Sequence, residues 1–65
     1  MESIQYLLAE YLEKNGITMS YVARSSGIKY ELLRRSLKGN RVLSADELIK
    51  ILRSTNIKIE DIVKY

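Results

Sequence analysis

The 65-residue sequence contains no cysteine and no histidine, and these two absences exclude several kinds of chemistry. A chain without cysteine forms no disulfide bond and has no thiol nucleophile, and zinc sites built from cysteine and histidine are excluded as well. A histidine-based catalytic triad is equally impossible. A domain this small also has little room for a cleft lined by carboxylates or lysines. We therefore expect no enzymatic activity, no cofactor and no metal site.

Long apolar runs and proline are also missing. No run approaches the roughly 20 apolar residues that a membrane-spanning helix needs, so we expect no membrane partner. The first residues, MESIQYLLAEYLEK, place acids among the apolar positions and lack the basic start of a signal peptide. These features favour a cytoplasmic protein. Since neither a linker nor a repeat interrupts the chain, we expect one domain that comprises residues 1–65.

The basic residues are concentrated in the middle of the chain. The formal net charge is +3, yet residues 17–42 contain six basic residues and only one acidic residue. Residues 1–16 contain three acids and one lysine, and the charges of residues 43–65 cancel. A local basic patch indicates an anionic partner such as nucleic acid. A solvated helix surface would give the same composition, so charge alone leaves both interpretations open.

Apolar residues recur with the period of an α-helix. In the first segment they form one stripe at positions i, i+3, i+4, i+7 and i+8. Near the C-terminal third, SADE is an S-x-x-E capping box that predicts a helix start. We expect the apolar residues of that helix to face inward: Ala45, Leu48, Ile49 and Leu52. Glycine and asparagine breaks predict an all-α, compact five-helix bundle with helices at about 2–14, 19–25, 30–38, 45–54 and 59–64.

The third predicted helix has two opposed faces. On a helical wheel Leu33 and Leu37 fall on one side, and the basic residues Arg34, Arg35 and Lys38 fall on the other. One face therefore suits a protein core and the other suits an anion.

The segment before this helix completes a helix-turn-helix pattern. Ala23 is small enough for a close helix crossing, Gly27 permits a sharp change of direction, and Ile28 can fill the corner. In DNA-binding versions of this unit the second helix lies in the major groove, where its N-terminal residues reach base edges.

The segments ITMSYVARSSGIKYELLRRSLKGNR and LSADELIKILRSTNIKIEDI resemble the Cro/CI-type, lambda repressor-like helix-turn-helix domains of phages and bacteria. The similarity covers about residues 3–63. It implies a repressor-like transcription regulator that binds double-stranded DNA as a homodimer, on a near-palindromic operator. It also implies that the helix at about 30–38 reads the major groove.

The resemblance assigns two sets of expected DNA contacts. Base edges would be contacted by Tyr30, Glu31, Arg34 and Arg35. The DNA backbone would be contacted by Met19, Ser20, Lys29, Lys38, Asn40 and Arg41. Arginine can donate a bidentate pair to guanine O6 and N7, although phosphate contacts would use the same side chains without reading sequence. Arg35 could instead pair with Glu31 one helical turn away, and Tyr30 could pack against the protein.

Three positions depart from the family pattern. Met19 stands where the family often has glutamine, Lys29 replaces a serine or threonine cap, and Ser36 stands where a large apolar residue is usual. Together with the acidic Glu31 and several spare tyrosines, the Met19 departure motivates an alternative. The chain would then be a protein-binding module on the same fold, such as an anti-repressor, and its partner would be another regulatory protein.

Apolar and aromatic residues near the C-terminus are candidates for a dimer contact. They are Ile59, Ile62, Val63 and Tyr65. The alternative, that they close the core of a small bundle, is equally compatible with their spacing.

Overall fold

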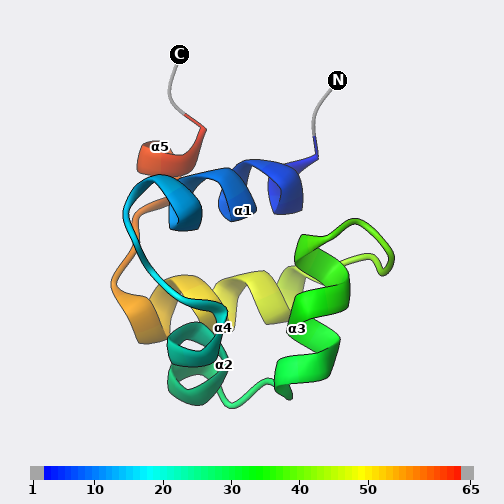
Figure 1. Cartoon of the computed structure of the whole chain (residues 1–65). Helices are drawn as coiled ribbons and strands as arrows, with labels where there is room; N and C mark the ends of the chain where they lie inside the picture. The colour runs from blue at the N-terminus through cyan, green and yellow to red at the C-terminus, as the bar shows by residue number, and fades with distance from the viewer. Residues whose placement is uncertain (1–2, 64–65) are drawn as a thin grey trace.

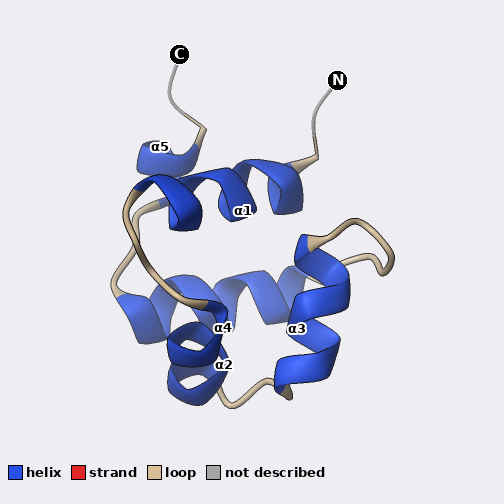
Figure 2. Ribbon diagram, in the orientation of Figure 1, coloured by secondary structure: helices blue, strands red, loops and turns tan. Residues whose placement is uncertain are grey.

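A computed structural model describes residues 3–63, which form five helices. The helices are α1 (Ile4–Lys14), α2 (Met19–Ser26), α3 (Tyr30–Leu37), α4 (Ala45–Thr55) and α5 (Ile59–Ile62). Figure 2 shows helices joined by loops, with no strand in this part of the chain. The predicted all-α, five-helix bundle is confirmed. The expected helix ends at Glu2 and Lys64, and the candidate dimer residue Tyr65, lie outside the described residues.

Side-chain caps begin three of the helices. Ser3 Oγ accepts a hydrogen bond from the backbone N of Tyr6 at 3.3 Å, and Thr18 Oγ1 accepts one from the backbone N of Tyr21 at 3.1 Å. The capping box expected at the start of α4 is present, with both of its reciprocal hydrogen bonds. These bonds satisfy amides that have no partner within the helix, so the local sequence determines where each of these helices begins.

The helices pack so that the α2–α3 pair is supported from two directions (Figure 1). The short α5 packs against α1, and α1 also contacts α3. On the other side, α4 packs against α2, and α2 packs against α3. The α2–α3 pair is therefore held by α1, which contacts α3, and by α4, which contacts α2.

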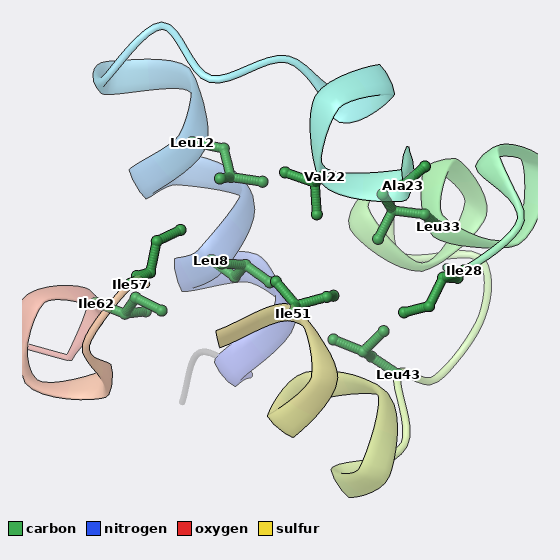
Figure 3. Packing of buried hydrophobic residues seen from close by; sticks show 10 residues of the cluster. All are labelled: Leu8, Leu12, Val22, Ala23, Ile28, Leu33, Leu43, Ile51, Ile57 and Ile62. Carbon is green, nitrogen blue, oxygen red and sulfur yellow. The ribbon is translucent and has the colours of Figure 1, made fainter. Parts of the chain in front are cut away.

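The core draws on every helix (Figure 3). Leu8, Leu33 and Ile51 are fully buried, and they come from α1, α3 and α4. In Figure 3, Ile57 and Ile62 lie toward one end of the cluster, whereas other members lie near the helix-turn-helix. This continuous apolar cluster joins the terminal helices to the α2–α3 pair.

The inward face of α4 differs from the prediction. Ile49 keeps 48% of its surface exposed and Ala45 is also exposed, whereas Ile51 is fully buried. Ile49 lies about 160° from Ile51 around the helix axis, so both cannot face the same core. Leu48 and Leu52 lie between these directions and are partly buried, as expected. The sequence prediction was wrong for Ile49 because it followed the i, i+3, i+4 apolar spacing and passed over Ile51.

Candidate nucleic-acid interface

The α2–turn–α3 segment has the geometry of a helix-turn-helix. Gly27 ends α2 with a left-handed φ of +77°, a conformation that strains residues with a Cβ atom. Ile28 then turns inward and is 9% exposed, and Ala23 is buried on the α2 face toward the core. Ser26 Oγ donates to the carbonyl of Val22 at 2.7 Å and accepts from the backbone N of Ile28 at 3.4 Å. The turn is therefore held both by its apolar corner and by a serine hydroxyl.

The two faces of α3 differ in burial as the helical wheel predicts. Leu33 and Ser36 are fully buried, and the neighbouring Leu37 is partly buried. Tyr30 is 45% exposed and Arg35 is also exposed. The helix therefore packs on the core with one side and presents an aromatic and basic surface on the other.

The first turn of α3 has no side-chain cap. Lys29 occupies the N-cap position with an extended backbone, and its side chain makes no capping hydrogen bond. The amides at this helix start are therefore not satisfied by the residue type that normally caps them. The lysine ammonium is left on the surface beside the helix start.

Glu31 pairs with Arg34 and not with Arg35, the partner that the sequence left open as an alternative to DNA contact. Arg34 Nη2 donates to Glu31 Oε2 at 2.8 Å, and the two side chains are 38% and 65% exposed. Pairs three apart on a helix meet as readily as pairs four apart, so the sequence did not decide between them. The hydrogen bond and charge of Arg34 lower the pKa of Glu31, and those of Glu31 raise the pKa of Arg34. Within residues 3–63, Arg35 forms no ion pair.

Arg41 is partly buried and bonded to side chains of its own chain, which differs from the exposed phosphate contact expected of it. Its Nη1 donates to Ser36 Oγ at 2.8 Å and to Glu47 Oε1 at 3.2 Å, and its Nη2 donates to Glu47 Oε2 at 2.8 Å. The planar guanidinium matches the carboxylate as a bidentate pair. The hydrogen bond from Arg41 is also the main cause of the lowered pKa of Glu47, and the pKa of Arg41 is raised in return. Arg41 therefore joins α3 to the start of α4.

Gln5 is a structural residue that the sequence did not reveal. Its Nε2 donates to the carbonyl of Ser36 at 2.6 Å and to the carbonyl of Arg41 at 2.8 Å. Its Oε1 accepts from the backbone N of Leu43 at 2.8 Å. The only sequence signal is that Gln5 lies three residues before the buried Leu8, at the border of the apolar stripe.

The remaining candidate backbone contacts occupy both ends of the helix-turn-helix. Ser20 is exposed at the start of α2, and Lys38 and Asn40 are exposed where α3 ends. Met19 is partly buried and packs against the core. Met19 and Lys38 border the same open hollow between α1, α2 and α3. The fold therefore brings the beginning of α2 close to the end of α3.

The C-terminal candidates for a dimer contact differ in how deeply they are buried. Ile62 is 6% exposed and belongs to the core, which is the alternative role that its spacing left open. Val63 is partly buried against that core, and Ile59 is 47% exposed. The single turn of α5 can point only part of its apolar side outward because the other part covers α1.

The described helices include none that combines the length and the apolar character needed to cross a bilayer. Among residues 3–63, no cluster of acidic side chains has the arrangement of a metal site.

Comparison with known protein families gives a match. The family model for the Cro/C1-type helix-turn-helix DNA-binding domain matches residues 8–65, which is most of the chain. Searches of curated proteins and of solved structures found no match. The matched range contains the whole α2–turn–α3 unit and its exposed basic surface. The chain therefore belongs to the Cro/C1-type helix-turn-helix DNA-binding family.

Proposed function

We propose that this protein is a sequence-specific regulator of transcription that reads the major groove of double-stranded DNA with α3. The observation that carries the proposal is the burial pattern of this helix. Leu33 and Ser36 are buried on one side, and an aromatic and basic surface that includes Arg35 lies on the other. A recognition helix needs both properties, since it must rest on its domain and still reach the bases.

Arg35 is the leading candidate for a base contact. It is exposed and makes no ion pair within the described residues, so no intramolecular bond has to break when it meets a base. Its guanidinium can donate two hydrogen bonds to guanine O6 and N7. Tyr30 precedes it by more than one helical turn and can contact a thymine methyl group or a phosphate.

Glu31 and Arg34 act as a pair in this proposal. Glu31 and Arg34 are three residues apart, and their side chains form an exposed ion pair at 2.8 Å. This pair lies on the same helix surface as Arg35. In this position Glu31 holds Arg34 toward the groove, and its carboxylate can accept from cytosine N4. Near non-cognate DNA the same carboxylate opposes the phosphates and lowers non-specific affinity.

Surface residues at the ends of the two helices supply the contacts to phosphate. The candidates are Ser20, Lys29, Lys38 and Asn40, all of which are exposed. Phosphate contacts fix the position of the protein on the duplex and make binding depend on salt. Met19, which is partly buried, would contribute mainly by packing at the start of α2.

Homodimers on a near-palindromic operator fit this proposal, with half-sites about 34 Å apart along the duplex. One module of this size presents a single short recognition helix, so a second copy would supply the affinity of a specific complex. Among the C-terminal candidates for that contact, Ile59 is exposed and Val63 is partly buried. A phage or bacterial repressor in the cytoplasm is the biological setting that the family suggests.

Selection of bound sequences from a random pool of DNA duplexes tests the proposal. The parent protein should yield a palindromic consensus, and Arg35→Ala should lose specific affinity for it by roughly 1–3 kcal/mol. Arg53→Ala is the matched control, because Arg53 is an exposed arginine near the end of α4, away from α3. If the Arg35→Ala variant binds the consensus sequence of the parent as tightly as the parent does, the assigned recognition face is wrong.

A protein-binding module on the same fold is the second candidate, and the Glu31–Arg34 pair is the observation that favours it. This pair reduces the free positive charge on the surface that would face DNA. A mobility-shift titration at about 50 mM and about 200 mM salt separates the two functions. Saturable binding that weakens at the higher salt supports DNA recognition, and no saturable binding at either salt supports the protein-binding module.

A further inference from the structure

The C-terminal end of α3 is joined to α1 and α4 by hydrogen bonds that the proposed DNA contacts do not use. Four side chains take part, and together they are called the α3 network: Gln5, Ser36, Arg41 and Glu47. One of them, Ser36, is the only polar side chain that is fully buried among the described residues. The members of the network occupy α1, α3, the α3–α4 loop and the first turn of α4.

Gln5 connects α1 with both the helix end and the loop. Its amide donates to the carbonyls of Ser36 and Arg41 at 2.6 and 2.8 Å and accepts from the backbone N of Leu43 at 2.8 Å. One side chain thus satisfies three backbone groups that come from the last turn of α3 and from the loop after it. Since hydrogen bonds are directional, these contacts define the orientation of α3 more narrowly than apolar packing does.

Ser36 and Glu47 both accept hydrogen bonds from the Arg41 guanidinium. Arg41 Nη1 meets the buried hydroxyl of Ser36 at 2.8 Å, and both terminal nitrogens of Arg41 donate to Glu47. A large apolar side chain at position 36 would occupy the space in which that hydroxyl meets the guanidinium. The serine is therefore matched to Arg41, which explains why α3 carries a small polar residue on its buried face.

We propose that Gln5 and Arg41 are positioning residues that set the orientation of α3, and through it the sequence specificity of DNA binding. This inference rests on the proposed function of α3. A base contact requires the side chain to be held within about 0.5 Å and 10–20° of its productive geometry. A phosphate contact tolerates far larger displacements, because it depends mainly on charge. Loosening the α3 network should therefore reduce specific binding much more than non-specific binding.

Glu47→Gln separates this role from the expected phosphate contact of Arg41. Glutamine still serves a capping box, so the start of α4 is retained while the charged partner of Arg41 is lost. If Arg41 is a phosphate ligand, freeing it should raise affinity for any duplex and steepen the salt dependence by about one phosphate contact. If Arg41 positions α3, the preference for the operator should fall.

The test measures Kd for the selected operator and for a random duplex of equal length, over a range of salt concentrations. The expected result for Glu47→Gln is a loss of about tenfold in the ratio of specific to non-specific affinity, similar to one misplaced base contact. Asp46→Asn is the matched control, since it removes one exposed carboxylate from the same helix turn but takes no part in the network. Its ratio should stay at the parent value.

Arg41→Lys provides a second variant that keeps the positive charge but cannot form the bidentate pair. It should lose specificity in the same direction, whereas a phosphate contact would survive this change. Partial unfolding cannot imitate the result, because it reduces the active fraction equally for both duplexes and leaves their ratio unchanged.

Suppose that the parent prefers its operator and that Glu47→Gln and Arg41→Lys both keep the parent's ratio of specific to non-specific affinity. This result would overturn the positioning role and leave the proposed function standing. A parent that binds no duplex saturably would overturn the proposed function, and the specificity role with it. These two failures are distinct, because the first requires a specific parent complex and the second excludes one.

Discussion

At its start α3 has no side-chain cap, and Glu31 in its first turn pairs in solvent with Arg34 of its exposed face, whereas the end of the helix is held by a hydrogen-bond network that reaches two other helices. The Glu31–Arg34 and Arg41–Glu47 pairs have the same shortest N–O distance, 2.8 Å. The exposed fractions of their side chains differ, at 65% and 38% for the first pair and 20% and 31% for the second, each glutamate first. The same kind of arginine–glutamate ion pair can therefore lie on a surface that meets a partner, or connect one helix firmly to another.

This difference suits a recognition helix. The residues on its exposed face must be free to meet base edges, so their side chains cannot be committed to the protein interior. Its C-terminal end must be immobile so that those residues arrive in the right place. Each of the following substitutions alters one end of α3 or the core between its ends. Together they measure how far the two ends differ in their contribution to stability.

Leu33→Ala should have the largest effect, because Leu33 is fully buried in the middle of α3 and supports both ends. Loss of this side chain should reduce the free energy of unfolding by about 2–5 kcal/mol. Thermal melts followed by circular dichroism measure the change. Ile49→Ala is the control, since Ile49 is an apolar residue that is half exposed on α4, and its melt should lie close to that of the parent. Equal losses in both variants would contradict the described core.

Gln5→Leu removes contacts at the C-terminal end of α3 and should have the next largest effect on stability. It leaves the backbone N of Leu43 and the carbonyls of Ser36 and Arg41 without their side-chain partner. An unsatisfied buried polar group costs about 1–3 kcal/mol, so we expect a loss of at least this size. Chemical denaturation measures it. A variant as stable as the parent would show that these hydrogen bonds do not hold the helix end.

Lys29→Ser acts on the N-terminal end and should increase stability. Serine at the N-cap position can accept from an amide of the first turn, which Lys29 does not do. The expected gain is about 1 kcal/mol, which raises the Tm of a domain this small by roughly 4–8 °C. Lys29→Ala is the control, since it removes the same charge without adding a cap. A gain shared by both variants would assign the effect to charge.

Glu47→Gln should weaken the acid dependence of stability. The pKa of Glu47 is lowered from its ordinary 4.5, mainly by the hydrogen bond from Arg41 and then by that from the backbone of Ser44. Because the folded-state pKa lies below the unfolded one, the stabilisation is present above the ordinary value and is lost as pH falls through the lowered pKa. Melts between about pH 5 and pH 3 should therefore show a steeper loss for the parent than for the variant. Parallel curves would contradict this contribution.

Glu31→Gln should have the smallest effect on stability. The lowered pKa of Glu31 acts in the same direction and in the same acid range, but its pair with Arg34 is exposed and screened by solvent and salt. We expect a melt at neutral pH that is indistinguishable from the parent, and little difference between low and high salt. A clear fall in Tm would show that the two ends of α3 are more alike than their burial indicates.

Much of the fold follows from local sequence signals. The apolar stripe of α1, the capping box of α4 and Gly27 with Ile28 at the turn each led to a structural prediction that the structure confirms. These signals act over a few residues, so the sequence shows them directly. The choice between Ile49 and Ile51 on α4 depends on where the rest of the core lies, and the spacing alone pointed to the wrong residue.

The polar contacts around α3 were predicted less well for the same reason. Gln5 meets partners that lie 31 to 38 residues away along the chain, and no local pattern predicts such a contact. Arg41 looked like a phosphate ligand because it lies in a basic loop, yet Glu47 and Ser36 both reach it after folding. Glu31 had two arginines within reach, and the folded helix pairs it with Arg34. Charge and spacing identify candidates, whereas the tertiary structure decides which of them stay exposed.

The central claim, that the exposed face of α3 meets DNA, is tested most directly by NMR titration of the isotope-labelled protein with its selected operator duplex. The account predicts that the largest chemical-shift changes fall on α3, including Tyr30 in its first turn and Arg35 in its last turn, and at the start of α2, including Ser20. The amides of α5 and of the outer side of α4 should change least. Shift changes confined to α4 and α5, with α3 unaffected at saturation, would contradict the claim.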